Sequence, residues 1–124
     1  MRRIATVALA LALAGCSMDS TGPNGSVEGT YSLTRIGGQT LPYTFSNGIT
    51  LMSEDLTLYS DGTYQDVSRY ANGQQGTDQG FYTESNGALV FQSNMDTRLT
   101  YQGSVSGNVL TDFVAGFTQT YQKR

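Results

Sequence analysis

The chain has 124 residues, seven of them basic and ten acidic, with a formal net charge of −3 and neither histidine nor tryptophan. Without histidine, Ser–His–Asp and Cys–His nucleophilic catalysis and histidine-ligated zinc are excluded. The acidic balance, with few and scattered cations, is a poor match for nucleic acid, so we expect no nucleic-acid partner.

The first residues have the three parts of a secretory signal. Two arginines form a positive start, residues 4–14 form a predominantly apolar run, and Leu13-Ala14-Gly15 precedes the only cysteine, Cys16. An apolar helix of eleven residues reaches about 16 Å, which is about half of the hydrocarbon core of a bilayer. The segment is therefore too short for a transmembrane anchor, and we interpret residues 1–15 as a signal peptide.

The end of this segment, Leu13-Ala14-Gly15-Cys16, resembles the lipobox of bacterial lipoproteins. The resemblance implies that the chain is cut after Gly15 and that Cys16 carries a diacylglycerol and an acylated amino terminus. Because Ser17 rather than aspartate follows the cysteine, the same resemblance implies sorting to the outer membrane. We therefore expect a lipid-anchored protein of the cell envelope, facing the periplasm or the cell surface.

Residues 16–26 are predicted to be the lipidated cysteine and a flexible tether. The tether is rich in Gly, Pro, Asn and Ser and has one apolar side chain, Met18. Removal of the signal leaves five basic residues against ten acidic ones, so the surface gives no help in holding anionic lipid. The membrane partner is therefore expected to be bound through the acyl chains alone.

From Val27 onward, short β-forming runs alternate with turn residues. The runs alternate apolar and polar residues with the period of a strand, as in Leu56/Leu58 and Leu89/Phe91. The turn pairs tolerate the positive φ angles of tight hairpins; they are Gly37-Gly38, Asn47-Gly48, Asp61-Gly62, Asn72-Gly73, Asn86-Gly87 and Gly107-Asn108.

This pattern predicts an all-β domain over residues 27–124, a small antiparallel up-and-down barrel of eight to nine strands. A two-sheet sandwich is the alternative. The barrel is favoured because closure removes the exposed strand edges.

Three local features refine this prediction. The apolar positions switch from odd at Leu51 to even at Leu56, which predicts a bulge at residues 53–55. Leu41-Pro42 lacks a backbone donor and suits an edge strand or a loop crossing a barrel end. Residues 72–80 hold three glycines and no apolar side chain, so we expect a loop at one end of the barrel.

Four sequence segments resemble the lipocalin-like lipoproteins of bacteria; they are residues 29–33, 56–64, 82–91 and 101–110. Lipocalins carry Gly-x-Trp on their first strand, and a basic residue near the end of the last strand covers the indole. Gly29-x-Tyr31 stands in that place here, and Lys123 or Arg124 is available as the cation. The resemblance implies a calycin-type barrel with a small apolar ligand pocket.

Candidate ligand-binding residues are the apolar and aromatic side chains at inward positions of such a barrel. Tyrosine suits amphipathic ligands, because it offers an apolar body and a polar tip. The alternative is that the same side chains fill the barrel as core. The candidates are Tyr31, Leu33, Leu58, Leu89, Phe91, Leu99, Tyr101 and Phe113.

Two other groups have a structural interpretation. Tyr59, Tyr64 and Tyr70 suit cross-strand pairs better than an exposed binding patch. The acidic residues Glu54-Asp55, Asp61 and Asp66 are interpreted as solvated turn and bulge residues, because neighbouring strand residues point to opposite faces and the calcium-loop pattern is missing. We therefore expect no metal site and no cofactor.

The sequence thus predicts a lipid-anchored envelope protein that binds a small hydrophobic or amphipathic ligand in a β-barrel without catalysis. The alternative is a filled barrel that acts as a protein–protein interaction module, either scaffold or inhibitor, for an unidentified envelope partner. An enzyme would need two carboxylates that converge in a cleft with raised pKa values, and no spacing in the sequence predicts such a pair.

Substitution Cys16→Ser tests the anchor. We expect the variant to leave the membrane fraction while its barrel stays folded, because the tether separates anchor from core. Fractionation of cells, with circular dichroism of the released protein, measures both effects. Persistent membrane association of the variant would show that the signal segment is retained or that the barrel itself docks.

Overall fold

The computed structural model describes residues 27–124, and the predicted signal peptide, the predicted lipidation site Cys16 and the predicted tether lie outside the described residues. All regular structure from Val27 to Arg124 is β-strand. Within this range, no helix has the length and apolar character that crossing a membrane requires.

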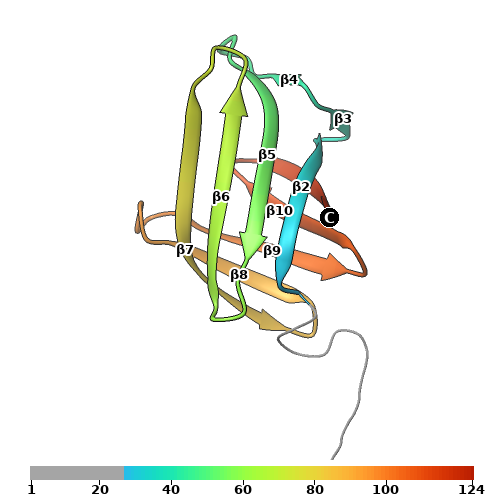
Figure 1. The fold of residues 1–124 in the computed structure, drawn as a ribbon, viewed down its shortest axis with the longest axis vertical. Helices are drawn as coiled ribbons and strands as arrows, with labels where there is room; N and C mark the ends of the chain where they lie inside the picture. Colours follow the sequence, from blue (N-terminus) through green and yellow to red (C-terminus); the bar gives the residue numbers. More distant parts are fainter. Residues whose placement is uncertain (1–26) are drawn as a thin grey trace, which may run out of the picture.

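Eight of the strands close into one antiparallel barrel (Figure 1). Each strand pairs with the next along the chain from β5 to β11, and β2 closes the sheet by pairing with both β5 and β11. The short strands β3 and β4 extend β2 and β5 at one end. The bounds are β2 Gly29–Ile36, β3 Gln39–Thr40, β4 Tyr43–Thr44, β5 Thr50–Leu58, β6 Thr63–Tyr70, β7 Gln75–Ser85, β8 Ala88–Ser93, β9 Thr100–Ser106, β10 Val109–Val114 and β11 Phe117–Lys123.

This architecture confirms the predicted up-and-down barrel and excludes the sandwich. The predicted turn pairs join its strands: the β7–β8 hairpin turns at Asn86 (φ 52°) and Gly87 (φ 87°), both with the positive φ of a tight hairpin. Leu41-Pro42 lies between the two short strands β3 and β4, at an end of the barrel as expected.

The expected bulge in β5 is present, slightly earlier than predicted. Leu51 pairs with Tyr70 and Ser53 with Arg69, so Met52 is the extra residue. Leu51 is buried before the bulge, and Glu54 and Leu56 are buried after it. The bulge therefore changes which residues of β5 point inward, and it places Glu54 inside the barrel.

The prediction of a loop over residues 72–80 is wrong. Only the start of that segment turns; Gln75–Gly80 belongs to β7 and pairs with β6. The polar composition of this segment suggested a loop, but its glycine has a packing role within a strand. β7 bends as it passes from β6 to β8 (Figure 1), and a Cβ on Gly80 would lie 2.0 Å from the Gln92 carbonyl oxygen.

One end of the barrel is closed by Tyr31 and Lys123. The Tyr31 hydroxyl donates to the Val27 carbonyl (2.7 Å), and the Lys123 ammonium lies 5.7 Å from the centroid of the Tyr31 ring. Gly29 allows this approach, since a Cβ there would lie 2.7 Å from Lys123 Cε. Of the two cations expected for this place, Lys123 covers the ring, and the barrel is compatible with a calycin-like fold.

The expected inward position of Phe113 is wrong, because this side chain is 65% exposed on the outside of β10. Its neighbours in the alternation, Leu110 and Asp112, point inward and are buried. The apolar pattern of β10 pointed to the wrong face, because Asp112, one of its inward residues, is a carboxylate.

Substitution Gly80→Ala is expected to destabilise the barrel by about 3 kcal/mol, because the added methyl group meets the β8 backbone. Gly76→Ala on the same strand is the matched control, since its Cβ would come no closer than 3.7 Å to any neighbour, the Tyr70 ring. Urea unfolding measures both. Equal stability of the two variants would show that β7 and β8 are not so closely apposed.

Candidate functional site: a pocket with a carboxylate floor

A pocket of about 250 Å³ lies at the end of the barrel opposite to Val27 and Tyr31. Leu51 and Tyr70, which pair at that end of β5 and β6, form part of its wall. The apolar lining is Phe45, Leu51, Tyr70, Leu99, Val114, Ala115 and Phe117. The polar lining is Glu54, Asp66, Ser68, Asp78, Tyr101 and Gln119.

Aromatic rings build the mouth of the pocket. Phe45, which follows β4, meets Phe117 of β11 edge-to-face with ring centroids 5.9 Å apart, and Tyr43 packs edge-to-face on both rings at 5.0 and 6.1 Å. These contacts tie the short strand β4 to the last strand of the barrel. The mouth is therefore an apolar surface held by the segment that contains Pro42.

Below this mouth, the carboxyl groups of Glu54 and Asp66 line the pocket, and we call them its carboxylate floor. Leu56 pairs with Asp66 and Glu54 with Ser68, so Glu54 and Asp66 are diagonal neighbours on the inner face of β5 and β6. Asp112 comes from the opposite side of the barrel and is 2% exposed. Asp66 Oδ1 and Asp112 Oδ1 are buried, and neither accepts a hydrogen bond from the described residues.

The Tyr121 hydroxyl joins this cluster to β11. It donates to Glu54 Oε2 at 2.9 Å and lies 3.1 Å from Gln119 Oε1. A tyrosine hydroxyl has a single hydrogen, so only one of these oxygens receives it at a time. When its carboxyl groups are ionised, the cluster therefore has more acceptors than donors.

Burial in this cluster raises the pKa values of two of its carboxyl groups, Asp66 and Asp112. Burial raises the pKa of Asp66 well above its usual range, and the neighbouring carboxyl groups of Glu54, Asp112 and Asp78 raise it further. Burial and, next, the Glu54 carboxyl raise the pKa of Asp112 to about 8. Two carboxyl groups inside the barrel thus hold protons at pH values where exposed carboxyls have lost them.

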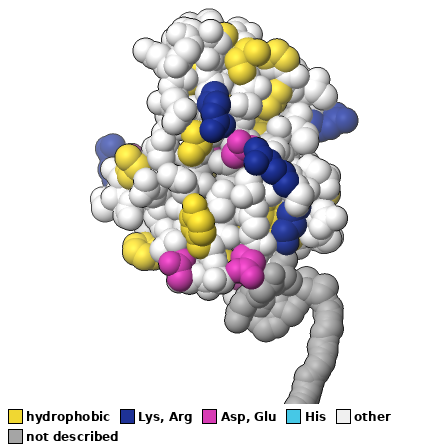
Figure 2. Space-filling view, viewed as in Figure 1, with side chains coloured by type: hydrophobic (Ala, Val, Ile, Leu, Met, Phe, Trp, Pro, Cys, Tyr) yellow, Lys and Arg dark blue, Asp and Glu magenta, His cyan; other side chains and the backbone are white. Residues whose placement is uncertain are grey.

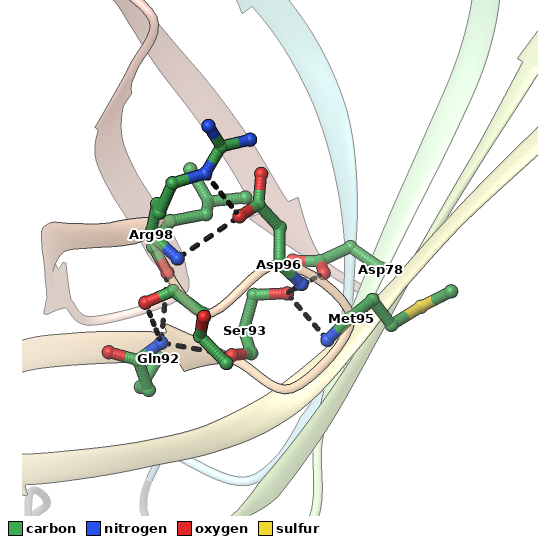
Figure 3. A network of polar contacts seen from close by, with 8 residues as sticks. Asp78, Gln92, Ser93, Met95, Asp96 and Arg98 are labelled. Atoms are coloured by element: carbon green, nitrogen blue, oxygen red, sulfur yellow. Dashed lines mark hydrogen bonds and ion pairs between the residues drawn. The ribbon is translucent and has the colours of Figure 1, made fainter.

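Asp78, at the edge of the cluster, accepts hydrogen bonds from side chains of the protein at both of its carboxylate oxygens. Its Oδ2 accepts the Tyr64 hydroxyl at 2.7 Å and its Oδ1 accepts the Ser93 hydroxyl at 2.5 Å. Figure 3 shows Ser93 between Asp78 and the loop after β8, where Ser93 Oγ accepts the backbone N–H groups of Met95 and Asp96 at 3.1 Å. Asp78 therefore helps to hold the loop that carries Leu99 to the pocket.

The basic side chains of the described chain make their contacts elsewhere. Arg69 and Arg124 pair with Asp55 at 3.2 and 2.8 Å on the outer face, where Figure 2 shows basic side chains beside an acidic one. Arg98 pairs with Asp96 at 3.2 Å, and its side chain is 88% exposed. No lysine or arginine is among the groups that shift the pKa of Asp66 or Asp112.

The structure divides the predicted site residues into three sets. Tyr31, Leu33, Leu58, Leu89 and Phe91 are buried in the barrel away from the pocket. Leu99 and Tyr101 line the pocket. Phe113 lies outside.

Core packing explains the first set. The Phe91 ring stacks on Tyr101 with centroids 4.7 Å apart, and Tyr64 packs against Phe91 at 5.2 Å. The barrel interior is thus filled below the pocket, as the alternative interpretation held. Ligand contact by any of the eight residues stays a prediction.

Sequence reasoning missed the carboxylate floor. The interpretation of Glu54 and Asp66 as solvated residues is wrong, since both line the pocket from inside. Asp61 is exposed in the β5–β6 turn as expected, where it accepts from Thr63 N–H at 3.0 Å. The signal was the phase of the alternation: after the bulge, Glu54 falls in step with the buried Leu56.

The tyrosine interpretations also divide. Tyr64 is buried, Tyr70 is half-buried at the pocket, and Tyr59 is 44% exposed. These three side chains therefore form no common exposed patch.

Comparisons with protein-family models, with curated proteins and with solved structures find no match for this chain. In the part of the chain that the structure describes, no group of three or more acidic or cysteine side chains is arranged to hold a metal ion.

The raised pKa values predict a pH dependence of stability. The unfolded chain loses the Asp112 proton near pH 4 and the folded chain near pH 8, so the free energy of unfolding falls as pH rises through this window, by about 1.4 kcal/mol per pH unit for each such carboxyl. Glu54 of β5, Asp66 of β6, Tyr101 of β9 and Tyr121 of β11 face the same interior.

Asp112→Asn is expected to flatten this fall between pH 5 and pH 8, and urea unfolding across the range measures it. Asp61→Asn is the control, because Asp61 is exposed and hydrogen bonding to Thr63 lowers its pKa. An unchanged slope in Asp112→Asn would show that Asp112 ionises normally in the folded protein.

Proposed function

We propose that this protein binds a small amphipathic molecule, without converting it, in the pocket at the open end of its barrel. The observation that carries the proposal is the layering of that end, with an apolar aromatic mouth above a polar floor. Binding sites for small molecules combine these features: an apolar wall provides affinity, and a few convergent polar groups fix orientation.

The volume limits the ligand. Pockets for drug-sized molecules measure about 300–1,000 Å³, and this pocket of about 250 Å³ lies below that range. The interior beneath it is filled by Tyr64, Phe91 and Tyr101. We therefore propose a ligand with one ring or a short chain rather than a long acyl chain.

The protein is further proposed to be a lipoprotein of the outer membrane, anchored through Cys16. Val27, the first described residue, lies at the closed end beside Tyr31, and the pocket lies at the opposite end. The tether therefore joins the barrel at the end opposite to the mouth of the pocket. This connection leaves the mouth free to face the aqueous space and supports capture of a molecule from there rather than from the bilayer.

A protein–protein interaction module is the second candidate. Phe81 and Phe113, on the outside of β7 and β10, are 57% and 65% exposed. Exposed aromatic side chains favour contact with another protein. Figure 2 shows the hydrophobic side chains of one face in separate patches rather than in one continuous surface.

Native mass spectrometry of the protein, purified gently from its own cells as the soluble Cys16→Ser variant, tests ligand binding. We expect an adduct of a few hundred daltons or less that is lost on unfolding. Leu99→Trp, which adds volume at the pocket wall, is expected to reduce its occupancy at least tenfold. Val90→Trp is the matched control, since Val90 is 42% exposed on the outside of β8. A bare protein mass in every sample would contradict the binding function and favour the interaction module.

A further inference from the structure

We propose that the ligand is a small organic cation, a protonated amine with one ring or a short apolar chain, whose ammonium group is bound by the carboxyl groups of Glu54 and Asp66. This inference rests on the proposed binding function and specifies the chemical class of its ligand.

The acceptors of the floor match an ammonium group. Glu54 and Asp66 both line the pocket from adjacent strands, and Glu54 Oε2 has the Tyr121 hydroxyl at 2.9 Å. Asp66 Oδ1 is buried and accepts no hydrogen bond from the protein, since its side-chain hydrogen bond is with the neighbouring acid Glu54, and Asp112 Oδ1 behind it also accepts none. An ammonium carries three N–H donors and no acceptor, so it supplies what the cluster lacks.

Charge points to the same ligand class. A buried carboxylate is costly unless it is paired, and the groups around Asp66 that shift its pKa are themselves acidic: Glu54, Asp112 and Asp78. A cation in the pocket lowers this cost, whereas a fatty acid or another anion raises it. The floor therefore selects against the acyl carboxylates that an apolar barrel would otherwise accept.

The mouth accommodates the rest of such a molecule. Phe45, Tyr70 and Phe117 give an apolar wall directly above the carboxyl groups. An amine reaching the floor passes the faces and edges of these rings, which attract cations as well as apolar groups. A bare metal ion would use the floor and leave the apolar wall without a partner.

Three probes that share a phenylethyl group and differ in charge separate the effect of ligand charge from that of ligand shape. They are phenethylamine, 2-phenylethanol and 3-phenylpropanoate. Isothermal titration into the full-length protein, purified in non-ionic detergent and blanked against the detergent alone, measures each affinity at pH 8. We expect phenethylamine to bind at least tenfold more tightly than the alcohol, and the carboxylate to bind more weakly than either.

Asp66→Asn and Glu54→Gln are expected to remove the preference for the amine and to leave the affinity for the alcohol within about threefold. Both substitutions keep side-chain volume, and circular dichroism checks the fold. Asp61→Asn, the same chemical change in the exposed β5–β6 turn, is expected to keep the preference. If Asp66→Asn does not fold, Glu54→Gln alone decides, because Glu54 lines the same floor.

Proton release gives an independent readout. The amine stays protonated up to about pH 10, as a lysine side chain does, while burial and neighbouring acids keep Asp66 and Asp112 protonated in the empty pocket. Amine binding should therefore release protons, and its affinity should rise from pH 5 to pH 8. Titration in two buffers of different ionisation enthalpy measures the number released.

The outcomes separate the two proposals. Equal affinity for the three probes overturns the proposal that the ligand is a cation and leaves the proposed binding function intact. Absence of amine binding also overturns the proposal that the ligand is a cation. A bare protein mass in native mass spectrometry then overturns the proposed binding function as well. Tight binding of Ca²⁺ alone that excludes phenethylamine identifies a metal site and overturns the inference.

Discussion

The pairing of β2 with both of its neighbours, β5 and β11, is the constraint on which the rest of the structure depends. Once the sheet is closed, every second residue of eight strands is placed in one interior, whatever its chemistry. The outer ion pairs support the closure at its seam, because Arg69 of β6 and Arg124 at the chain end meet at Asp55 of β5. Closure therefore fixes both the packed core and the carboxyl groups above it.

The interior is divided by polarity along the barrel axis. At the end near Val27, tyrosine, phenylalanine and leucine side chains fill the space, and the Tyr31 hydroxyl is paired with the Val27 carbonyl. Toward the other end, Glu54, Asp66 and Asp112 replace apolar residues at inward positions. Buried carboxyls without donors cost free energy that an apolar residue of similar volume would not, so this half of the barrel is less stable than it could be.

The sequence predicts the fold better than the site because the two depend on different signals. Turn pairs such as Asn86-Gly87 and the alternation of β-forming residues are local, and they determine strands and hairpins. Which face of a strand points inward depends on register. The bulge at Met52 reversed the phase in β5, and in β10 the exposed Phe113 hid the inward Asp112. A search for acidic residues in phase with buried leucines would have found Glu54 and Asp112.

Gly80 in β7 shows a second limit of prediction from sequence. Residues 75–80 carry no apolar side chain, yet they form a strand, because Gly80 lets β7 bend against β8 where any Cβ would collide with the backbone. Composition reports which side chains can be buried, and it does not report where two backbones must approach. The same bend carries Asp78 to the edge of the pocket, where Tyr64 and Ser93 satisfy it.

The difference between Asp78 and Asp66 is therefore informative. Two carboxyls of the same interior lie on adjacent strands and pair in register, and the protein supplies hydroxyl donors to one and leaves an oxygen of the other without a partner. Satisfying Asp78 orders the loop that holds Leu99, which is a structural task. We find no task of that kind for Asp66 Oδ1, which accepts no hydrogen bond within the described chain, and the proposed cation would give this buried acceptor a donor.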